Sequence, residues 1–221
     1  MLYVVATPIG NLEDITLRAI RILGEVDFIL AEDTRKTIRL LKHHRILFKE
    51  VISFHEHNEG KRVFPVIEKL LSGKNCALVS NAGTPSISDP GFKIIKKCLE
   101  NNISVTSIPG PSSVINGLVL SGLAVDSFCY FGFLPRKKGK REKIFKQIKV
   151  FDNTAIILES PYRVLATLNE MLDFFGERQV CLLREMTKLF EQRICGKISE
   201  VISSVKGKQL KGEFVIVLSK D

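Results

Sequence analysis

The stretch Leu2-Tyr3-Val4-Val5-Ala6-Thr7-Pro8-Ile9-Gly10-Asn11 joins a short apolar run to a turn that contains proline and glycine. Similar junctions recur along the first half of the chain. The apolar runs span residues 2–6, 27–31, 51–54, 77–80 and 105–108. They lack strict polar alternation, which is typical of strands covered on both faces of a parallel sheet.

Amphipathic stretches separate these runs, at residues 15–23, 34–42, 63–71 and 92–100. Because strands that alternate with helices of this length form βαβ units, the first half predicts a mostly parallel sheet. The second half has more strands in close succession, which predicts a mixed sheet. We expect its strands at residues 128–131, 154–158, 180–184, 190–195 and 213–218, and its helices after Pro111 and at residues 138–149, 161–174 and 199–204.

The segment Pro109-Gly110-Pro111 divides these two patterns. The sequence therefore predicts an α/β protein with two α/β domains. Residues 1–110 form the N-terminal domain with its mostly parallel sheet, and residues 111–221 form the C-terminal domain with its mixed sheet.

The formal net charge is +9, and two segments concentrate the basic residues. Residues 135–149 contain eight basic side chains and one acid, Glu142, which gives +7, and residues 35–49 contain six basic side chains and no acid. Such clustering favours a polyanionic partner such as nucleic acid. The alternative is a pair of solvated helix faces that only keep the protein in solution.

Several classes of protein are disfavoured. No apolar run is long enough to cross a membrane, and the N-terminus lacks the basic region of a signal peptide, so we expect a cytoplasmic protein. The five scattered cysteines predict free, buried thiols. His55 and His57 have no further ligands nearby, so no metal site is predicted.

Each predicted N-terminal strand is followed by a polar or glycine- and proline-rich segment. If the strands are parallel, these segments share one edge of the sheet, where ligands of such sheets bind. Five ordinary turns would look the same. The pairs Asp89-Pro90 and Ser160-Pro161 predict capped helix starts. Neither a G-x-G-x-x-G fingerprint nor a Walker P-loop is present.

Taken together, the motifs resemble the tetrapyrrole-methylase superfamily and, within it, the small-subunit ribosomal RNA methyltransferase I family. The resemblance runs from residue 2 to about residue 218. The segments that carry it are residues 3–16, Ala31-Glu32-Asp33-Thr34-Arg35, residues 53–59, Val79-Ser80-Asn81-Ala82-Gly83-Thr84-Pro85, Ser88-Asp89-Pro90-Gly91, residues 108–113, Gly132-Phe133-Leu134-Pro135, Glu159-Ser160-Pro161-Tyr162-Arg163, Arg184-Glu185-Met186-Thr187-Lys188 and Lys211-Gly212-Glu213.

The resemblance implies a tetrapyrrole-methylase fold, with S-adenosylmethionine in the cleft between two α/β domains, and a homodimer. It implies methyl transfer to the 2′-hydroxyl of a cytidine in the decoding region of 16S rRNA. The cofactor residues that it implies are Pro8, Gly83, Thr84, Pro85, Ser88, Ser112, Ser113, Leu158, Glu159, Arg184 and Gly212. Asn81 departs from the family, which usually has aspartate there, so cofactor affinity is expected to differ.

Methyl transfer to a hydroxyl requires in-line geometry and a group that removes the proton. The candidates in the motifs are Asp33, Glu159, Glu185 and Lys188, and Asp33 has the alternative roles of pairing with Arg35 or capping a helix. The predicted RNA-binding residues are Arg35, Lys36, Arg136, Lys137, Lys138, Lys140 and Arg141. Two other functions stay open: a small-molecule methyltransferase of the tetrapyrrole type, and an RNA-binding factor with weakened catalysis.

Overall fold

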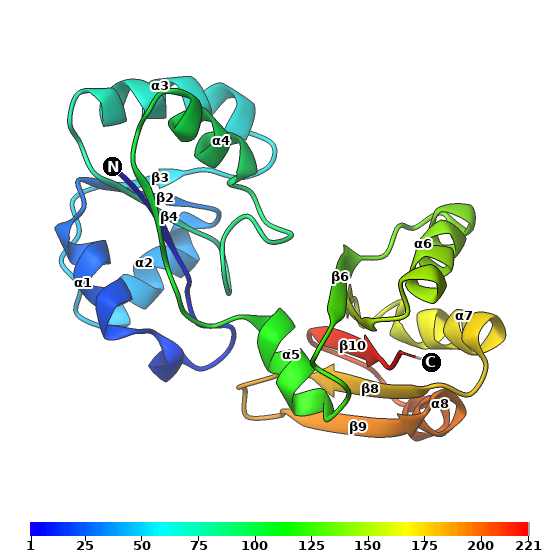
Figure 1. Cartoon of the computed structure of the whole chain (residues 1–221). Helices are drawn as coiled ribbons and strands as arrows, with labels where there is room; N and C mark the ends of the chain where they lie inside the picture. Colours follow the sequence, from blue (N-terminus) through cyan, green and yellow to red (C-terminus); the bar gives the residue numbers. More distant parts are fainter. Residues whose placement is uncertain (221) are drawn as a thin grey trace. The chain divides into compact units, whose positions relative to one another are not determined.

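The computed structural model describes residues 1–220, which form two compact units (Figure 1). The first unit is Met1–Ser112, and the second begins at Ser113. Each unit contains one five-stranded sheet with its own helices.

The sheet of the first unit is entirely parallel, in the order β3-β2-β4-β1-β5. Its strands are β1 (Leu2–Val5), β2 (Phe28–Ala31), β3 (Val51–Ser53), β4 (Cys76–Val79) and β5 (Val105–Ile108). The predicted parallel sheet is therefore confirmed. The carboxyl ends of all five strands lie at the same edge, which gathers the segments that follow them.

Helices cover both faces of this sheet. They are α1 (Leu17–Glu25), α2 (Thr34–His43), α3 (Glu59–Leu71) and α4 (Phe92–Glu100), and a short 3-10 helix, η1 (Leu12–Asp14), precedes α1. Successive strand residues point to opposite faces. Ile29 therefore packs in the core beneath α1 and α2, while Leu30 packs in the core beneath α3 and α4. Both residues are buried, as the apolar runs predicted.

The sheet of the second unit is mixed, in the order β6-β7-β10-β8-β9. Its strands are β6 (Phe128–Phe133), β7 (Thr154–Glu159), β8 (Gln179–Arg184), β9 (Gln192–Lys197) and β10 (Phe214–Leu218). β6 is parallel to β7, whereas β10 is antiparallel to both of its neighbours. The last strand in sequence thus lies at the centre of the sheet, where it brings the ends of β7 and β8 close together.

One helix covers one face of the second sheet and three cover the other. α5 (Ser113–Ser121) contacts β8 and β10, and its Gly117 is so close that a Cβ there would lie 3.0 Å from Val215. The opposite face carries α6 (Lys138–Phe151), α7 (Val164–Phe175) and α8 (Ile198–Val205), whose apolar residues form a single core with the sheet.

The two predicted helix caps are wrong. α4 begins at Phe92 with Gly91 as its N-cap, and the Asp89 carboxyl accepts a hydrogen bond from Ser80 instead. α7 begins at Val164, and Ser160 contributes only its carbonyl, at 3.1 Å from the Val164 nitrogen. In both cases the proline lies in a turn that precedes the helix.

The prediction of free thiols is wrong for one pair of cysteines. Cys181 and Cys195 form a disulfide, because the register of β8 and β9 places them directly opposite each other. Register between strands is not visible in the spacing of cysteines along the chain. Cys76 and Cys98 are free and buried, and Cys129 is free and half-buried. Within residues 1–220, no helix has the length and apolar character needed to cross a membrane.

Candidate active site

Three segments meet at the carboxyl edge of the parallel sheet. Thr7 and Gly83 exchange two backbone hydrogen bonds, both of 2.9 Å, which join the segments after β1 and β4. The Thr84 hydroxyl donates to the Pro111 carbonyl at 3.5 Å, which joins the segments after β4 and β5. The sequence placed these segments at one edge, and the structure brings them into contact.

Gly83 lies at the centre of this group with φ +77°, a conformation that glycine adopts without strain. Its missing side chain allows the segments after β1 and β5 to pack against this backbone. A Cβ there would lie 3.5 Å from the Ile9 side chain and 3.8 Å from the Pro111 carbonyl oxygen. Pro8 and Pro85 are buried beside it, whereas Ser88 is exposed further along the same segment with φ 62°.

Glu32, Asn81 and Asp89 form a polar group at the ends of β2 and β4. The backbone N–H of Asn81 donates to the Glu32 carboxylate at 3.0 Å. The Asn81 side-chain oxygen is buried and has no hydrogen-bond partner among the described residues. Burial, together with the nearby Glu32 carboxylate, raises the pKa of Asp89 to about 6. Neither acid was among the predicted site residues, although both stand in segments that directly follow a predicted strand.

Asp33 has the two structural roles that the sequence left open. Its carboxylate caps α2 by accepting the Arg35 backbone N–H at 2.9 Å, and it also pairs with the Arg35 guanidinium at 2.9 Å. Hydrogen bonding by Arg35 lowers the pKa of Asp33 to about 2. A carboxylate held in this way is a weak base, so the geometry favours capping.

In the second unit, two distant motifs form one charged cluster. The Lys188 ammonium donates to Glu185 Oε1 and to Glu213 Oε2, each at 2.9 Å. The Glu213 backbone N–H donates to the same Glu185 oxygen at 2.9 Å, and the Glu185 N–H donates to the Glu213 carbonyl at 3.0 Å. Glu185 and Lys188 were predicted site residues, whereas the part played by Glu213 was not foreseen. Its only signal was the Lys211-Gly212-Glu213 motif.

The backbone around this cluster has unusual conformations. Glu185 and Thr187 have φ values of 52° and 65°, which side-chain-bearing residues rarely adopt. Arg184 is fixed to the same motif, because its Nε donates to the Lys211 carbonyl at 2.7 Å. Conformations of this kind cost about 1–3 kcal/mol each and concentrate at functional sites. The cluster is therefore the best candidate for chemistry in the second unit.

The charges of the cluster indicate different roles for its members. Burial raises the pKa of Glu185, but hydrogen bonds from Lys188 and from the Glu213 backbone outweigh it, so the net pKa is lowered. Burial lowers the pKa of Lys188, but its two carboxylate partners outweigh that effect and the net pKa is raised. Lys188 therefore stays protonated. Its geometry favours the role of a cation that orients Glu185 over that of a base.

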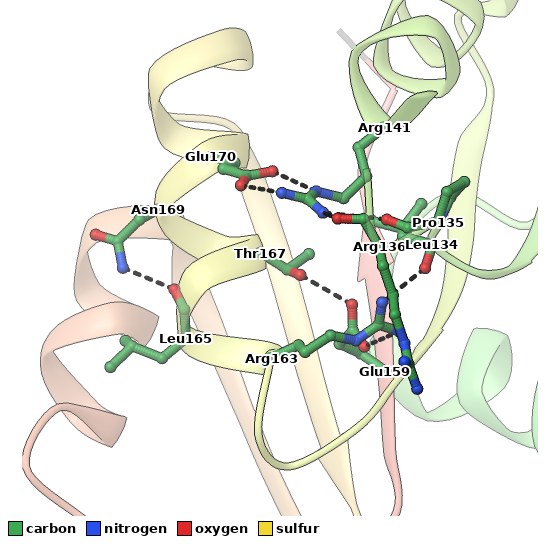
Figure 2. Close-up of polar contacts among 10 residues, drawn as sticks. All are labelled: Leu134, Pro135, Arg136, Arg141, Glu159, Arg163, Leu165, Thr167, Asn169 and Glu170. Carbon is green, nitrogen blue, oxygen red and sulfur yellow. Dashed lines mark hydrogen bonds and ion pairs between the residues drawn. The ribbon is translucent and has the colours of Figure 1, made fainter. Parts of the chain in front are cut away.

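Glu159 is fully buried, and its carboxylate is saturated with partners (Figure 2). Oε1 accepts the Ser160 backbone N–H at 2.7 Å and pairs with the Arg163 guanidinium at 2.7 Å, while Oε2 accepts the Thr167 hydroxyl at 2.8 Å. Its neighbour Leu158, a predicted cofactor residue, is half-buried. These contacts favour a supporting role for Glu159 and leave Glu185 as the most accessible of the carboxylate candidates in this unit.

Most of the predicted RNA-binding residues in the two basic segments, residues 35–49 and 135–149, form no ion pair among the described residues. Of the predicted RNA residues, Lys36, Arg136, Lys137, Lys138 and Lys140 are exposed, and none forms a direct ion pair among residues 1–220, although the charge of Lys138 acts on Glu170 at longer range. Arg35 is exposed but pairs with Asp33. Arg141 is different, because its guanidinium is mostly buried and pairs with Glu170. Within the described residues, no three His, Cys, Asp or Glu side chains gather as a metal site.

A family model of the tetrapyrrole (corrin/porphyrin) methylases matches residues 1–202. A Streptococcus pyogenes serotype M3 protein, ribosomal RNA small subunit methyltransferase I, is 48% identical over 218 residues, covering 99% of this chain and 76% of the relative. The Thermotoga maritima protein of the same name is 45% identical over 218 residues, covering 99% and 97%.

Solved structures show the same fold. Diphthine synthase matches with a TM-score of 0.74 at 15% identity, covering 99% of this chain and 89% of that one. Uroporphyrin-III-C-methyltransferase from Thermus thermophilus matches with a TM-score of 0.65 at 19% identity, covering 99% and 94%.

Together, the fold and these similarities define a methyltransferase. The chain belongs to the tetrapyrrole (corrin/porphyrin) methylase family, whose members use S-adenosylmethionine as the methyl donor. One feature of the first unit fits such a ligand. The buried Asn81 side-chain oxygen lacks a donor among the described residues. An ammonium or hydroxyl group of the cofactor would supply that donor.

Proposed function

We propose that this methyltransferase modifies the ribose 2′-hydroxyl of a cytidine in the decoding region of 16S rRNA. The observation that carries the proposal is the exposed basic segment Arg136–Lys140, whose cations form no direct ion pair among the described residues, in a chain whose relatives are named as small-subunit rRNA methyltransferases. Lysine and arginine contacts to phosphates position a nucleic acid without reading its sequence. A tetrapyrrole substrate has no phosphodiester backbone for these side chains to contact.

The proposed cofactor contacts in the first unit are Pro8, Gly83, Thr84, Pro85, Ser88 and Ser112, and those in the second are Ser113, Leu158, Glu159, Arg184 and Gly212. When bound, S-adenosylmethionine supplies an electrophilic methyl group on a sulfonium. The protein's own contribution is to hold the ribose 2′-oxygen in line with that methyl group and to accept the proton of the 2′-hydroxyl.

We assign the proton-accepting role to Glu185. Its Oε1 is occupied by Lys188 and by the Glu213 N–H, whereas its Oε2 accepts no hydrogen bond within residues 1–220. Lys188 keeps the carboxylate ionised and fixes its orientation. Asp33 and Glu159 remain alternatives, but both of their carboxylates are already engaged by neighbours.

The test is transfer of labelled methyl from S-adenosylmethionine to small ribosomal subunits that lack the modification. We expect one methyl per subunit, at a ribose that becomes resistant to alkaline cleavage. A DNA copy of the target lacks the hydroxyl and should not be labelled. Labelling of a tetrapyrrole but not of subunits would favour the small-molecule alternative, and subunit binding without labelling would favour the RNA-binding factor.

The basic segment has its own test. The triple variant Lys137→Glu, Lys138→Glu, Lys140→Glu should weaken subunit binding and flatten its dependence on salt. The matched control is Lys61→Glu, Arg62→Glu, Lys74→Glu, which changes the same charge at three exposed positions of the first unit. Equal losses in both variants would mean that only net charge matters.

We also propose that the protein acts in the cytoplasm as a homodimer. This assembly is implied by the family resemblance. Light scattering should report a mass of about twice 24.8 kDa at micromolar concentration. A mass of one chain would contradict the dimer.

A further inference from the structure

Three consecutive carbonyls at the start of the basic segment are held by arginines (Figure 2). Arg163 Nη1 donates to the Leu134 carbonyl at 2.8 Å. Arg141 Nη1 donates to the Pro135 carbonyl at 3.1 Å and to the Arg136 carbonyl at 2.6 Å. The backbone that leads from β6 into α6 is therefore tied at every residue from Leu134 to Arg136.

Each of these arginines is itself anchored by a glutamate. Arg141 makes a two-pronged ion pair with Glu170, at 2.7 Å from Nε and 2.5 Å from Nη2. Arg163 pairs at 2.7 Å with Glu159, whose side chain is fully buried. Guanidinium groups suit this task, because their planar fork bonds a carboxylate on one side and leaves further N–H groups for carbonyls.

Three residues at the start of α7 take part in these contacts. Arg163, Thr167 and Glu170 follow each other at spacings of four and three residues at the start of α7, which places them side by side. Thr167 donates to Glu159 and so fixes the anchor of Arg163. α7 thus supports the whole clamp, which we define as Arg141, Arg163, Glu159 and Glu170.

Arg136, whose carbonyl is the last one bonded by the clamp, has an exposed side chain, and so do the next two residues, Lys137 and Lys138. Three adjacent cations repel one another, and a free segment with this charge would sample many extended conformations. Binding such a segment to RNA would then require ordering its backbone as well as its side chains. A backbone that is already fixed lowers the entropy cost of that ordering.

We infer that Arg141 and Arg163 are positioning residues, which hold the segment from Leu134 to Arg136 so that the exposed cations after it are presented to RNA phosphates in one arrangement. The inference rests on the proposed function, since it assigns a support to the RNA contact. It also reassigns Arg141, one of the predicted RNA-binding residues, from a direct contact to a support.

The decisive variant is Arg141→Lys, which keeps the charge but has only three N–H donors, all on one atom, and so cannot replace the four hydrogen bonds of the Arg141 guanidinium. The control is Lys146→Arg, which also keeps the positive charge, at an exposed position of α6. Amide hydrogen exchange across residues 134–140 should speed up in Arg141→Lys only. Affinity for small subunits should fall by roughly tenfold, which is the order of the entropy cost of fixing the backbone of one residue anew, while calorimetric binding of S-adenosylmethionine stays unchanged.

Faster exchange with unchanged subunit affinity would overturn the inference, because the clamp would then serve stability alone. Unchanged exchange would overturn it as well. If Arg141→Lys does not fold, Glu170→Gln carries the same test, since it removes the anchor and leaves the guanidinium in place. Failure of the proposed function is distinguishable, because the wild type itself would then neither bind nor methylate subunits.

Discussion

Gly212 lies so close to Glu185 that a Cβ on the glycine would be 2.5 Å from the Glu185 carboxylate. Its φ of +97° is also one that side-chain-bearing residues rarely adopt. The contact joins two motifs that are far apart in sequence, and it depends on the absence of a side chain at residue 212.

We therefore predict that Gly212→Ala lowers the free energy of unfolding by about 1–3 kcal/mol and displaces the Glu185 carboxylate. Methylation of small subunits should fall more than this loss of stability explains. Urea unfolding and methylation assays at a temperature where both proteins are folded would measure the two effects. The control is Gly60→Ala in α3, where an added Cβ meets nothing within 4 Å and should be neutral or mildly stabilising.

Replacing Lys188 by glutamine should destabilise the protein in a pH-dependent way. Glu185 has a lowered pKa in the folded state, so its stabilising contribution is present above its ordinary pKa of 4.5 and is lost as the pH falls through the lowered value. The variant should lose about 1.5–3 kcal/mol at pH 7. That difference from wild type should shrink in unfolding experiments near pH 3, whereas Lys61→Gln should differ little at either pH.

Asp89 should show the opposite dependence on pH. Its pKa is raised from 3.8 to about 6 in the folded state, so its favourable contribution is complete below pH 3.8 and is lost as the pH rises through about 6. Asp89→Asn removes this loss. Relative to wild type, the variant should gain on the order of 2 kcal/mol of stability between pH 4 and pH 7.

Asp126→Asn provides a control for that experiment, because a hydrogen bond from Lys220 lowers the pKa of Asp126. Its stability relative to wild type should stay nearly constant over the same range, because the lowered pKa places the titration of Asp126 below pH 3.8. A pH-independent difference for Asp89→Asn would show that the Asp89 carboxyl titrates normally beside Glu32 and Ser80.

Gly83→Val should weaken the binding of S-adenosylmethionine roughly tenfold or more in calorimetry, a loss of at least about 1.4 kcal/mol. The matched control is Gly73→Val, because Gly73 also has a positive φ, of 89°, but lies in the turn before β4. Both variants carry backbone strain, and Gly83→Val should lose more stability because its side chain also presses on Ile9 and Pro111, so cofactor affinity is compared at a temperature where both are folded. Equal cofactor affinity in the two variants would contradict a cofactor contact at Gly83.

The alternation of strands and helices could be predicted from the sequence because it depends on local periodicity. The apolar runs near residues 77 and 105 became β4 and β5, and the basic helix expected at residues 138–149 became α6. The predicted first residue of a helix was less accurate where the first turn is polar. α3 begins at Glu59 and not at residue 63, since its first turn is polar and shows no apolar period.

The sequence by itself determined the parallel and mixed sheets, the basic segments and the motifs of the family. The tertiary structure alone decided which motifs meet and which cations are free. Glu185 joins Glu213 because β10 lies between β7 and β8, and Cys181 opposes Cys195 because of strand register. Arg141 is withdrawn from solvent because α7 presents Glu170 to it. The physical reason is that pairing between distant side chains follows from sheet order, register and helix packing, which residue spacing along the chain does not encode.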